Sequence, residues 1–514
     1  MTHEPVDALT GLPQRRIAPV WFAILATATA IVALVLRLVD LNHVPAELYG
    51  DIGIVYDYLR EIQLGHWPVD YVLSAGPLYH YLAWPLMRVF GFTFLGIKLA
   101  SVVISLLGLV TLYRLGRDLL HAELGLLAAF IGAVSSWLLI FSRLGNSQIL
   151  LPLLSTGALI FAVRLARWGQ MGDAIACAVV SALGLYAYPQ TFVMPPVLLF
   201  TLFCLLLTGT AVRWQHLLAF CVATIPCALP FGRLVARDPE NFFSGYIGGK
   251  LEPLANPLVV LGRNILHALL AFNVHGDAVF RSNPASLPHL DPISGVLFLG
   301  GIVFWLWPPR WRLSPALLVP FLLLQVPSML VLRYPNEVPS ASRTLAVAPL
   351  AYLLAASGLW WLLDTLRRYR HSAVLLVAGM LLVIVNVNTQ RYFDIYADGL
   401  PDHNTPFGLI VAQYIDALPA DTQVLVAGCC WSEGSQPEPK SILYTMKSKH
   451  VVRFEDLDKL TCLTLAEMPR PAVLVWDPAA DIPSPRLQRC TAGLHPQLYS
   501  SPRGGQVFKV SPLP

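Results

Sequence analysis

The chain has 514 residues, of which 56% are hydrophobic and only 13% charged, whereas soluble domains carry about 25% charged residues. This composition excludes a soluble globular protein, and the small formal net charge of +4 gives no reason to expect a nucleic-acid partner. Apolar runs of about 17 to 22 residues recur from Ile17 to Asn388, and each can cross about 30 Å of hydrocarbon. The sequence therefore predicts an all-α polytopic membrane protein.

The apolar runs predict about eleven transmembrane helices. The first run follows Arg15 and Arg16, is too long for a signal-peptide core and has no clear cleavage site, so we expect it to remain as a span. The predicted spans are 17–38, 93–113, 122–141, 147–166, 173–188, 191–208, 215–231, 293–307, 314–332, 344–363 and 372–388.

Positive charges predict how these spans are oriented, because Lys and Arg in short loops collect on the cytoplasmic side. They occupy every second connection, at Arg15/Arg16, Arg114/Arg117, Arg164/Arg167, Arg213, Arg310/Arg312 and Arg367/Arg368/Arg370. We expect a multi-pass plasma-membrane protein with a cytoplasmic N-terminus (1–16), a transmembrane domain (17–390) and an extracytoplasmic domain (391–514). The long loops 39–92 and 232–292 then lie on the outer face, where the protein is expected to act.

Two outer regions have patterns of their own. Ile52, Val55, Leu59 and Ile62 recur at helical spacing, which predicts an interfacial amphipathic helix over 52–64. A second short helix is predicted over 77–90, with Pro77 in its first turn. The C-terminal region alternates strand-like runs (423–427, 472–476, 506–510) with helical candidates (404–418, 435–448, 455–467). It is predicted to be a small α/β domain.

Four cysteines lie in this C-terminal domain, Cys429, Cys430, Cys462 and Cys490. In an oxidising compartment they could form two disulfides, with three possible connectivities, although the adjacent pair is disfavoured as its own partner. A metal site is the weaker alternative, because no Cys-x-x-Cys spacing or histidine cluster accompanies them.

Asp51 follows the first span and precedes the predicted helix over 52–64. A carboxylate there could act only as a helix cap, since the helix dipole favours negative charge at an N-terminus. The alternative is a catalytic carboxylate at the membrane surface.

Two arginines fall on the predicted outer side, against the positive-inside rule. Arg143 lies in the short connection 141–148, and Arg343 lies at the start of the tenth span. Either could extend to the headgroups, but a cation retained on this side also indicates an anionic partner. Guanidinium binds phosphate through two hydrogen bonds without losing its charge, so a lipid-linked phosphate is the expected ligand.

The loop 271–292 concentrates polar residues in an otherwise apolar chain, and turn formation explains most of them. His275, Asp277 and Arg281 remain as candidates for a substrate or metal site, together with His80, whose position also suits the headgroup level. His275 and Asp277 could ligate a divalent metal, but two ligands are too few to identify one. No other cofactor is expected.

The order of these features resembles the membrane glycosyltransferases of the C superfamily, of the family 39 type that includes protein O-mannosyltransferases and lipid A aminoarabinose transferases. The resemblance covers about residues 20 to 400. Its motifs are Gly50-Asp51, Gly76-Pro77-Leu78-Tyr79-His80-Tyr81-Leu82, Leu112 to Arg117, Ser142-Arg143, Leu185 to Pro189, Phe272 to Pro292 and Ser342-Arg343-Thr344.

The resemblance implies transfer of a sugar from a polyprenyl-phosphate donor to an acceptor on the outer face, with membrane lipids as surroundings. Asp51 would be the general base, Arg143 and Arg343 would bind the donor phosphate, and a single displacement would invert the anomeric carbon. The chain departs from the family at Ile52, where relatives carry a second acid, and at Asn146 or Gln148, where another acid is common.

Two alternatives of other classes remain from the sequence. A transporter or flippase of lipid-linked sugars would place charged sites near the membrane midplane, whereas the polar residues here gather in outer loops. An inactive relative that binds polyprenyl lipid would fit the departures at Ile52 and Asn146. The sugar and the acceptor, whether lipid, glycan or protein, are not specified by the sequence.

Overall fold

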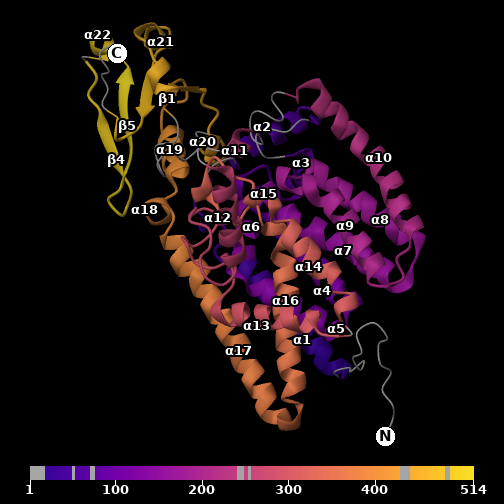
Figure 1. Cartoon of the computed structure of the whole chain (residues 1–514). Coiled ribbons are helices and arrows are strands. Elements are labelled where there is room, and N and C mark those ends of the chain that lie inside the picture. Colours follow the sequence, from indigo (N-terminus) through magenta and orange to yellow (C-terminus); the bar gives the residue numbers. More distant parts are fainter. Residues whose placement is uncertain are drawn as a thin grey trace. The chain divides into compact units, whose positions relative to one another are not determined.

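The structure is a computed structural model that describes residues 18–48, 52–69, 76–239, 248–252, 256–308, 310–428, 440–480, 487–491 and 493–513 (Figure 1). The chain forms two compact units. The helical unit comprises Met1–Val39, Pro68–Ala83 and Leu99–Tyr396, and the sheet unit comprises Asp40–Trp67, Trp84–Lys98 and Ala397–Pro514. Most of the first outer loop therefore belongs with the C-terminal region.

The described part of the chain has seven helices long and apolar enough to cross a membrane, as expected of a polytopic membrane protein. They are α1 (Pro19–Leu38), α4 (Phe94–Leu119), α7 (Leu150–Trp168), α9 (Met194–Leu207), α10 (Trp214–Arg237), α16 (Ala348–Thr365) and α17 (Arg370–Gln390), some of them extended by a turn of 3₁₀ or π helix. A bent pair, α5 (Ala122–Val134) and α6 (Ser136–Leu144), makes an eighth candidate.

The other three predicted spans coincide with shorter apolar helices. These are α8 (Met171–Leu183), α13 (Pro292–Leu306) and the pair α14 (Pro315–Leu323) and α15 (Val326–Met329). The predicted number of about eleven therefore exceeds the seven or eight that are long enough. The sequence also missed α12 (Pro257–Leu270) and the single turn α11 (Gly249–Leu251), both within the loop predicted over 232–292.

The predicted span 122–141 is broken rather than continuous, because α5 and α6 are bent by 64°. Polar side chains from distant helices bind the backbone groups at the break. Arg37 donates to the carbonyl oxygen of Ala133 at 2.9 Å, and the amide nitrogen of Ser136 donates to the Oδ1 of Asn388 at 2.9 Å. These bonds matter because water does not reach unpaired backbone groups in a bilayer.

Helices α13 and α16 pack with their backbones close together. A Cβ atom at Gly301 would overlap the carbonyl of Leu354, and one at Gly358 would overlap the carbonyl of Leu297. Small residues permit such close packing between membrane helices, where dispersion rather than the hydrophobic effect favours association.

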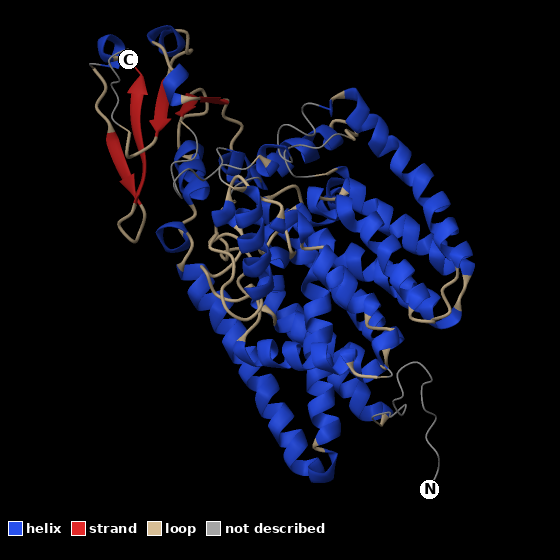
Figure 2. Ribbon diagram, in the orientation of Figure 1, coloured by secondary structure: helices blue, strands red, loops and turns tan. Residues whose placement is uncertain are grey.

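The sheet unit contains α2 (Ile52–Gln63), the second half of α3 (Pro77–Phe90) and a five-stranded sheet (Figure 2). The strand order is β2-β1-β3-β5-β4, parallel from β2 to β3 and antiparallel from β3 to β4. The strands are β1 (Gln423–Ala427), β2 (Val452–Glu455), β3 (Ala472–Trp476), β4 (Gln497–Ser500) and β5 (Gln506–Leu513). The three predicted strands are confirmed, and β2 and β4 were not predicted.

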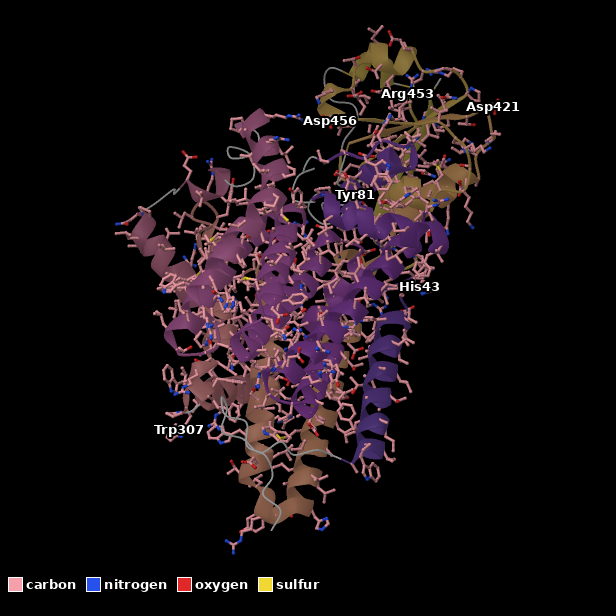
Figure 3. The ribbon with its side chains drawn as sticks, turned by 90° about the vertical axis from the view of Figure 1, so that its right-hand side faces the viewer. His43, Tyr81, Trp307, Asp421, Arg453 and Asp456 are labelled. Atoms are coloured by element: carbon pink, nitrogen blue, oxygen red, sulfur yellow. A yellow bond between two sulfur atoms is a disulfide. The ribbon has the colours of Figure 1, made fainter. Side chains whose placement is uncertain are left out.

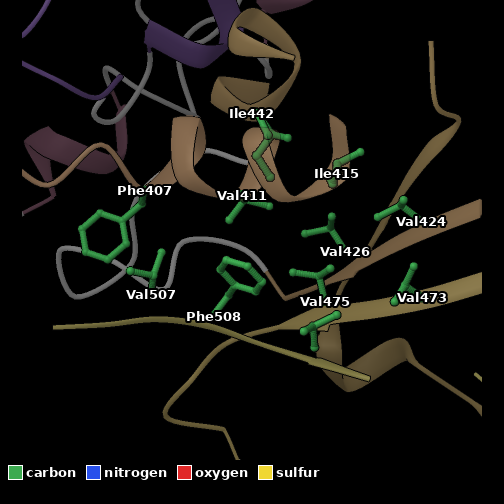
Figure 4. Packing of buried hydrophobic residues seen from close by; sticks show 12 residues of the cluster. Phe407, Val411, Ile415, Val424, Val426, Ile442, Val473, Val475, Val507 and Phe508 are labelled. Atoms are coloured by element: carbon green, nitrogen blue, oxygen red, sulfur yellow. The ribbon is translucent and has the colours of Figure 1, made fainter. Parts of the chain in front are cut away.

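Short helices accompany the sheet: α18 (Pro401–Asn404), α19 (Phe407–Asp416), α20 (Lys440–Thr445), α21 (Cys462–Ala466) and α22 (Gln488–Thr491). One face of the sheet packs against α19, where Val424, Val426 and Val473 contact a cluster that includes Val411 and Phe508 (Figure 4). The alternate residues Leu425, Leu474 and Trp476 pack into a second buried cluster, so the central strands are covered on both faces. Charged side chains such as Asp421, Arg453 and Asp456 are exposed on this unit (Figure 3).

A disulfide joins Cys462, the first residue of α21, to Cys490, near the end of α22. This pair belongs to the connectivity that the sequence disfavoured, since the other pair of that connectivity is Cys429–Cys430. Cys429 and Cys430 lie outside the described residues.

Candidate active site

The described chain flanks Asp51 on both sides, but Asp51 itself lies outside the described residues. The segment before it ends at Leu48, and α2 begins at Ile52. Helix α2 has the predicted amphipathic character, with Val55, Leu59 and Ile62 buried and Asp57 exposed. The proposed carboxylate therefore stands in sequence directly before a helix with one buried face.

Arg343 lies in a charged cluster with Glu337 and Lys250. The Arg343 guanidinium, buried to 8% exposure, donates to Oε2 of Glu337. The Lys250 ammonium donates to the same oxygen at 2.7 Å and to Oε1 at 2.9 Å. Two cations thus share one carboxylate oxygen.

The carboxylate of this cluster stays ionised. Burial alone would raise the pKa of Glu337, but the hydrogen bonds and charges of Lys250 and Arg343 outweigh burial and lower it. Sequence reasoning missed Lys250 and Glu337. Lys250 meets the criterion that selected Arg343, because it is a cation on the predicted outer side. No local sequence pattern identifies Glu337.

Asp277 joins the loop 271–292 to the segment that carries Arg343. Its Oδ1 accepts from the Val279 amide at 2.8 Å, and its Oδ2 accepts from the Ala341 amide at 2.8 Å. Burial raises the pKa of Asp277 to about 6, opposed by these two amides and then by the charges of Arg343 and Arg281. The structure therefore brings the predicted residues Asp277, Arg281 and Arg343 into one electrostatic neighbourhood.

The backbone around Arg343 is held from a second side as well. The indole nitrogen of Trp137, in α6, donates to the carbonyl oxygen of Ala341 at 3.0 Å. Ala341 is thus bound through both of its backbone groups, two residues before Arg343. Such fixed backbone favours a preorganised guanidinium.

The two histidine candidates differ in exposure. His275 is exposed, whereas Asp277, which the sequence suggested as a second metal ligand beside it, is buried. His80 is fully buried in α3, where its Nδ1 lies 2.8 Å from the carbonyl oxygen of Gly76, and burial lowers the pKa of its imidazole to about 4. Within the described ranges no group of three or more His, Cys, Asp or Glu side chains could hold a metal ion.

Arg143 is the second-to-last residue of α6 and is also completely buried. Its guanidinium donates to the carbonyl oxygen of Leu36 at 2.7 Å and lies over the rings of Tyr392 and Phe393, at 5.0 and 5.3 Å from their centroids. These contacts join α6 to α1 and to the turn of π helix that follows α17, and cation–π contacts add to them.

Comparisons with known proteins place these features in context. Residues 74–231 match the family model described as dolichyl-phosphate-mannose-protein mannosyltransferase. Among curated protein sequences, none matches this chain.

Solved structures match over nearly the whole chain. ArnT from Cupriavidus metallidurans bound to undecaprenyl phosphate is similar with a TM-score of 0.61 at 14% identity, covering 97% of this chain and 99% of that one. The oligosaccharyltransferase of Archaeoglobus fulgidus in its apo form has a TM-score of 0.55 at 13% identity, covering 96% and 74%. The oligosaccharyltransferase AglB from Archaeoglobus fulgidus, in complex with an inhibitory peptide and a dolichol-phosphate, has a TM-score of 0.51 at 13% identity, covering 95% of this chain and 74% of that one.

Proposed function

Because this chain has the fold of the membrane glycosyltransferases of the C superfamily and matches the protein mannosyltransferase type, as its sequence motifs predicted, we propose that it is a glycosyltransferase. It transfers a sugar from a polyprenyl-phosphate donor to an acceptor on the extracytoplasmic face. The observation that carries this proposal is the pair of cations, Lys250 and Arg343, that converge on one carboxylate oxygen. A phosphate offers the same kind of acceptor oxygen.

The donor's phosphate is a good leaving group whose charge must be stabilised as the glycosidic bond breaks. Arg343 and Lys250 supply fixed positive charge for this purpose, and Arg143 is the proposed second arginine of the clamp. The structures of ArnT with undecaprenyl phosphate and of AglB with dolichol-phosphate show that proteins of this fold bind such lipids.

Asp51 is the proposed general base that removes the proton from the acceptor hydroxyl. With one carboxylate in this role and no second acid assigned as a nucleophile, a single displacement with inversion is the expected course. The position of Asp51 before α2 suits it to the membrane surface.

The proposed outer face is supported by two independent features. The disulfide between Cys462 and Cys490 is typical of an oxidising compartment, and arginines alternate between connections as the positive-inside rule requires. The disulfide favours an extracytoplasmic C-terminal domain, and the arginines favour a cytoplasmic N-terminus.

The test uses purified protein in lipid nanodiscs, radiolabelled polyprenyl-phosphate sugars and a panel of lipid, glycan and peptide acceptors. We expect transfer by the wild type and its loss in Asp51→Asn, with polyprenyl-phosphate binding retained. Asp57→Asn is the matched control, because it removes the same charge from an exposed site on the neighbouring helix.

Two outcomes would overturn parts of the proposal. Equal transfer by the wild type and Asp51→Asn would remove Asp51 from catalysis. Lipid binding by the wild type without transfer to any acceptor would favour a flippase or an inactive lipid-binding relative.

A further inference from the structure

Glu47 is a buried carboxylate that the proposed mechanism does not use. It lies four residues before Asp51 in the sequence and is only 3% exposed. Its Oε1 accepts from the amide of Leu48 at 2.9 Å, and its Oε2 accepts from the amide of Gly408, the second residue of α19. A carboxylate from the first outer loop is thus bound by the N-terminus of a C-terminal helix, where free amides and the helix dipole favour negative charge.

The same short segment has further bonds within the sheet unit. The Asn404 side chain accepts from the amide of Ala46 at 2.7 Å and donates to the carbonyl oxygen of His43 at 2.7 Å. Lys98, at the start of α4, donates to the carbonyl oxygens of Leu41 at 2.8 Å and Pro45 at 2.5 Å. Residues 41–48 are therefore fixed by the C-terminal domain on one side and by Lys98 on the other.

The chain on the other side of Asp51 also packs on the C-terminal domain. Helix α2 lies against α20 within the sheet unit. The buried residues Val55, Tyr58 and Leu59 stabilise α2, and each is at most 2% exposed. Both flanks of the proposed catalytic residue are thus attached to the domain that follows the last span.

We propose that Glu47 is a positioning residue, which ties the loop that carries Asp51 to α19 and so makes the C-terminal α/β domain the support of the catalytic base. This inference rests on the proposed function of Asp51. It assigns the C-terminal domain a role in the transfer step that does not require any contact with the donor or the acceptor.

The charge environment makes this contact sensitive to the ionisation of Glu47. Burial raises the pKa of Glu47 to about 7, while the amides of Gly408 and Leu48, then the Ser441 hydroxyl and the charge of Lys98, act in the opposite direction. The amides bind the ionised carboxylate best. A glutamine at this position keeps the shape of the side chain but replaces one of the two acceptor oxygens with an NH2 group, which cannot accept from a backbone amide. It therefore tests the contact without a cavity.

Two variants disrupt the contact from opposite sides. Glu47→Gln acts from the loop, and Gly408→Ala acts from α19, because a Cβ at Gly408 would overlap the Ser441 side chain and press on Oε2 of Glu47. The matched control is Asp416→Asn. Asp416 also binds backbone amides, those of Lys447 and Ser448, but within the C-terminal domain and at the other end of α19.

The experiment measures kcat and KM for the polyprenyl-phosphate sugar, together with hydrogen–deuterium exchange of peptides covering 41–63. Both Glu47→Gln and Gly408→Ala are expected to lower kcat about 10- to 100-fold with KM within about twofold, because a misplaced base costs rate rather than donor binding. Exchange over 41–63 should quicken in both, and the double variant should be no worse than the single ones. Asp416→Asn should change neither quantity.

The outcomes separate this inference from the proposed function. Unchanged exchange over 41–63 in both variants overturns the contact, and unchanged kcat despite faster exchange overturns its role in positioning Asp51. If the wild type transfers no sugar, the proposed function fails, and the exchange measurement alone decides whether the C-terminal domain holds the loop.

Discussion

Replacing Glu337 by glutamine tests the charged cluster that the proposed phosphate site depends on. In the structure, the Glu337 carboxylate accepts hydrogen bonds from both Lys250 and Arg343. A donor phosphate that binds these cations must compete with this carboxylate. Glu337→Gln removes the competitor while preserving its size, so it should strengthen the binding of polyprenyl phosphate.

The magnitude follows from the geometry of the cluster. Because Lys250 and Arg343 donate to the same oxygen of Glu337, their charges are about 5 Å apart, and at an effective dielectric constant of about 20 they repel by about 3 kcal/mol. The side chains of Lys250 and Glu337 are 22% and 31% exposed, so solvent screening reduces this to about 1–2 kcal/mol. In Glu337→Gln, a bound phosphate relieves this repulsion of about 1–2 kcal/mol. The variant should therefore bind polyprenyl phosphate about 5- to 30-fold more tightly than the wild type does.

The assay is equilibrium binding of polyprenyl phosphate to the wild type and Glu337→Gln in nanodiscs of neutral lipid. The control is Glu252→Gln, which removes an exposed carboxylate paired with Arg333 at 2.6 Å in the same region. We expect the control to bind within about twofold of the wild type, as exposed pairs contribute little. Equal or weaker binding by Glu337→Gln would refute the idea that Glu337 occupies the place of the phosphate.

Three further predictions concern stability. Cys462→Ser should cost about 3–4 kcal/mol, since the disulfide closes a loop with a sequence separation of 28, and thermal unfolding with and without reductant will measure it. Gly301→Leu should separate α13 from α16 and lower the Tm by several degrees, whereas Gly262→Leu, where space is open, should not. Burial raises the pKa of Glu47 in the folded protein to about 7, above its ordinary value of 4.5. The folded protein therefore binds this proton more tightly than the unfolded chain does, and the resulting stabilisation is fully present below about pH 4.5. That contribution, about 3 kcal/mol at most, is lost as the pH rises through 7; Glu47→Gln should flatten this dependence of the Tm.

Hydropathy predicted the helices well because the bilayer imposes one simple requirement, an apolar surface of sufficient length. It could not predict the break between α5 and α6. That break depends on Arg37 and Asn388, which bind backbone groups near Ser135 from far away in the sequence. The short helix α12 was missed for a related reason, since its polar neighbours made the whole segment resemble a loop.

The site was predicted less completely than the fold. Arg343 and Asp277 stood out as polar residues in apolar surroundings, and the structure brings them together. Glu337 lies only six residues before Arg343, but no local pattern identifies it as the partner of that arginine. Lys250 was missed because it meets Glu337 across 87 residues of sequence. The role of Asp277, which binds the Ala341 amide, depends on backbone geometry that no side-chain pattern records.

Arg143 and Arg343 show why a misplaced positive charge is not sufficient to identify a phosphate ligand. Both were selected by the same rule, yet their surroundings differ in kind. Arg143 is bound by a helix carbonyl and two aromatic rings, and a phosphate that took these places would leave the Leu36 carbonyl unpaired in an apolar interior, at a cost of about 1–3 kcal/mol. Arg343 is bound by a carboxylate, which a phosphate can replace with an equivalent anion while Glu337 turns toward solvent. The binding of an anionic donor is therefore expected to depend more strongly on Arg343.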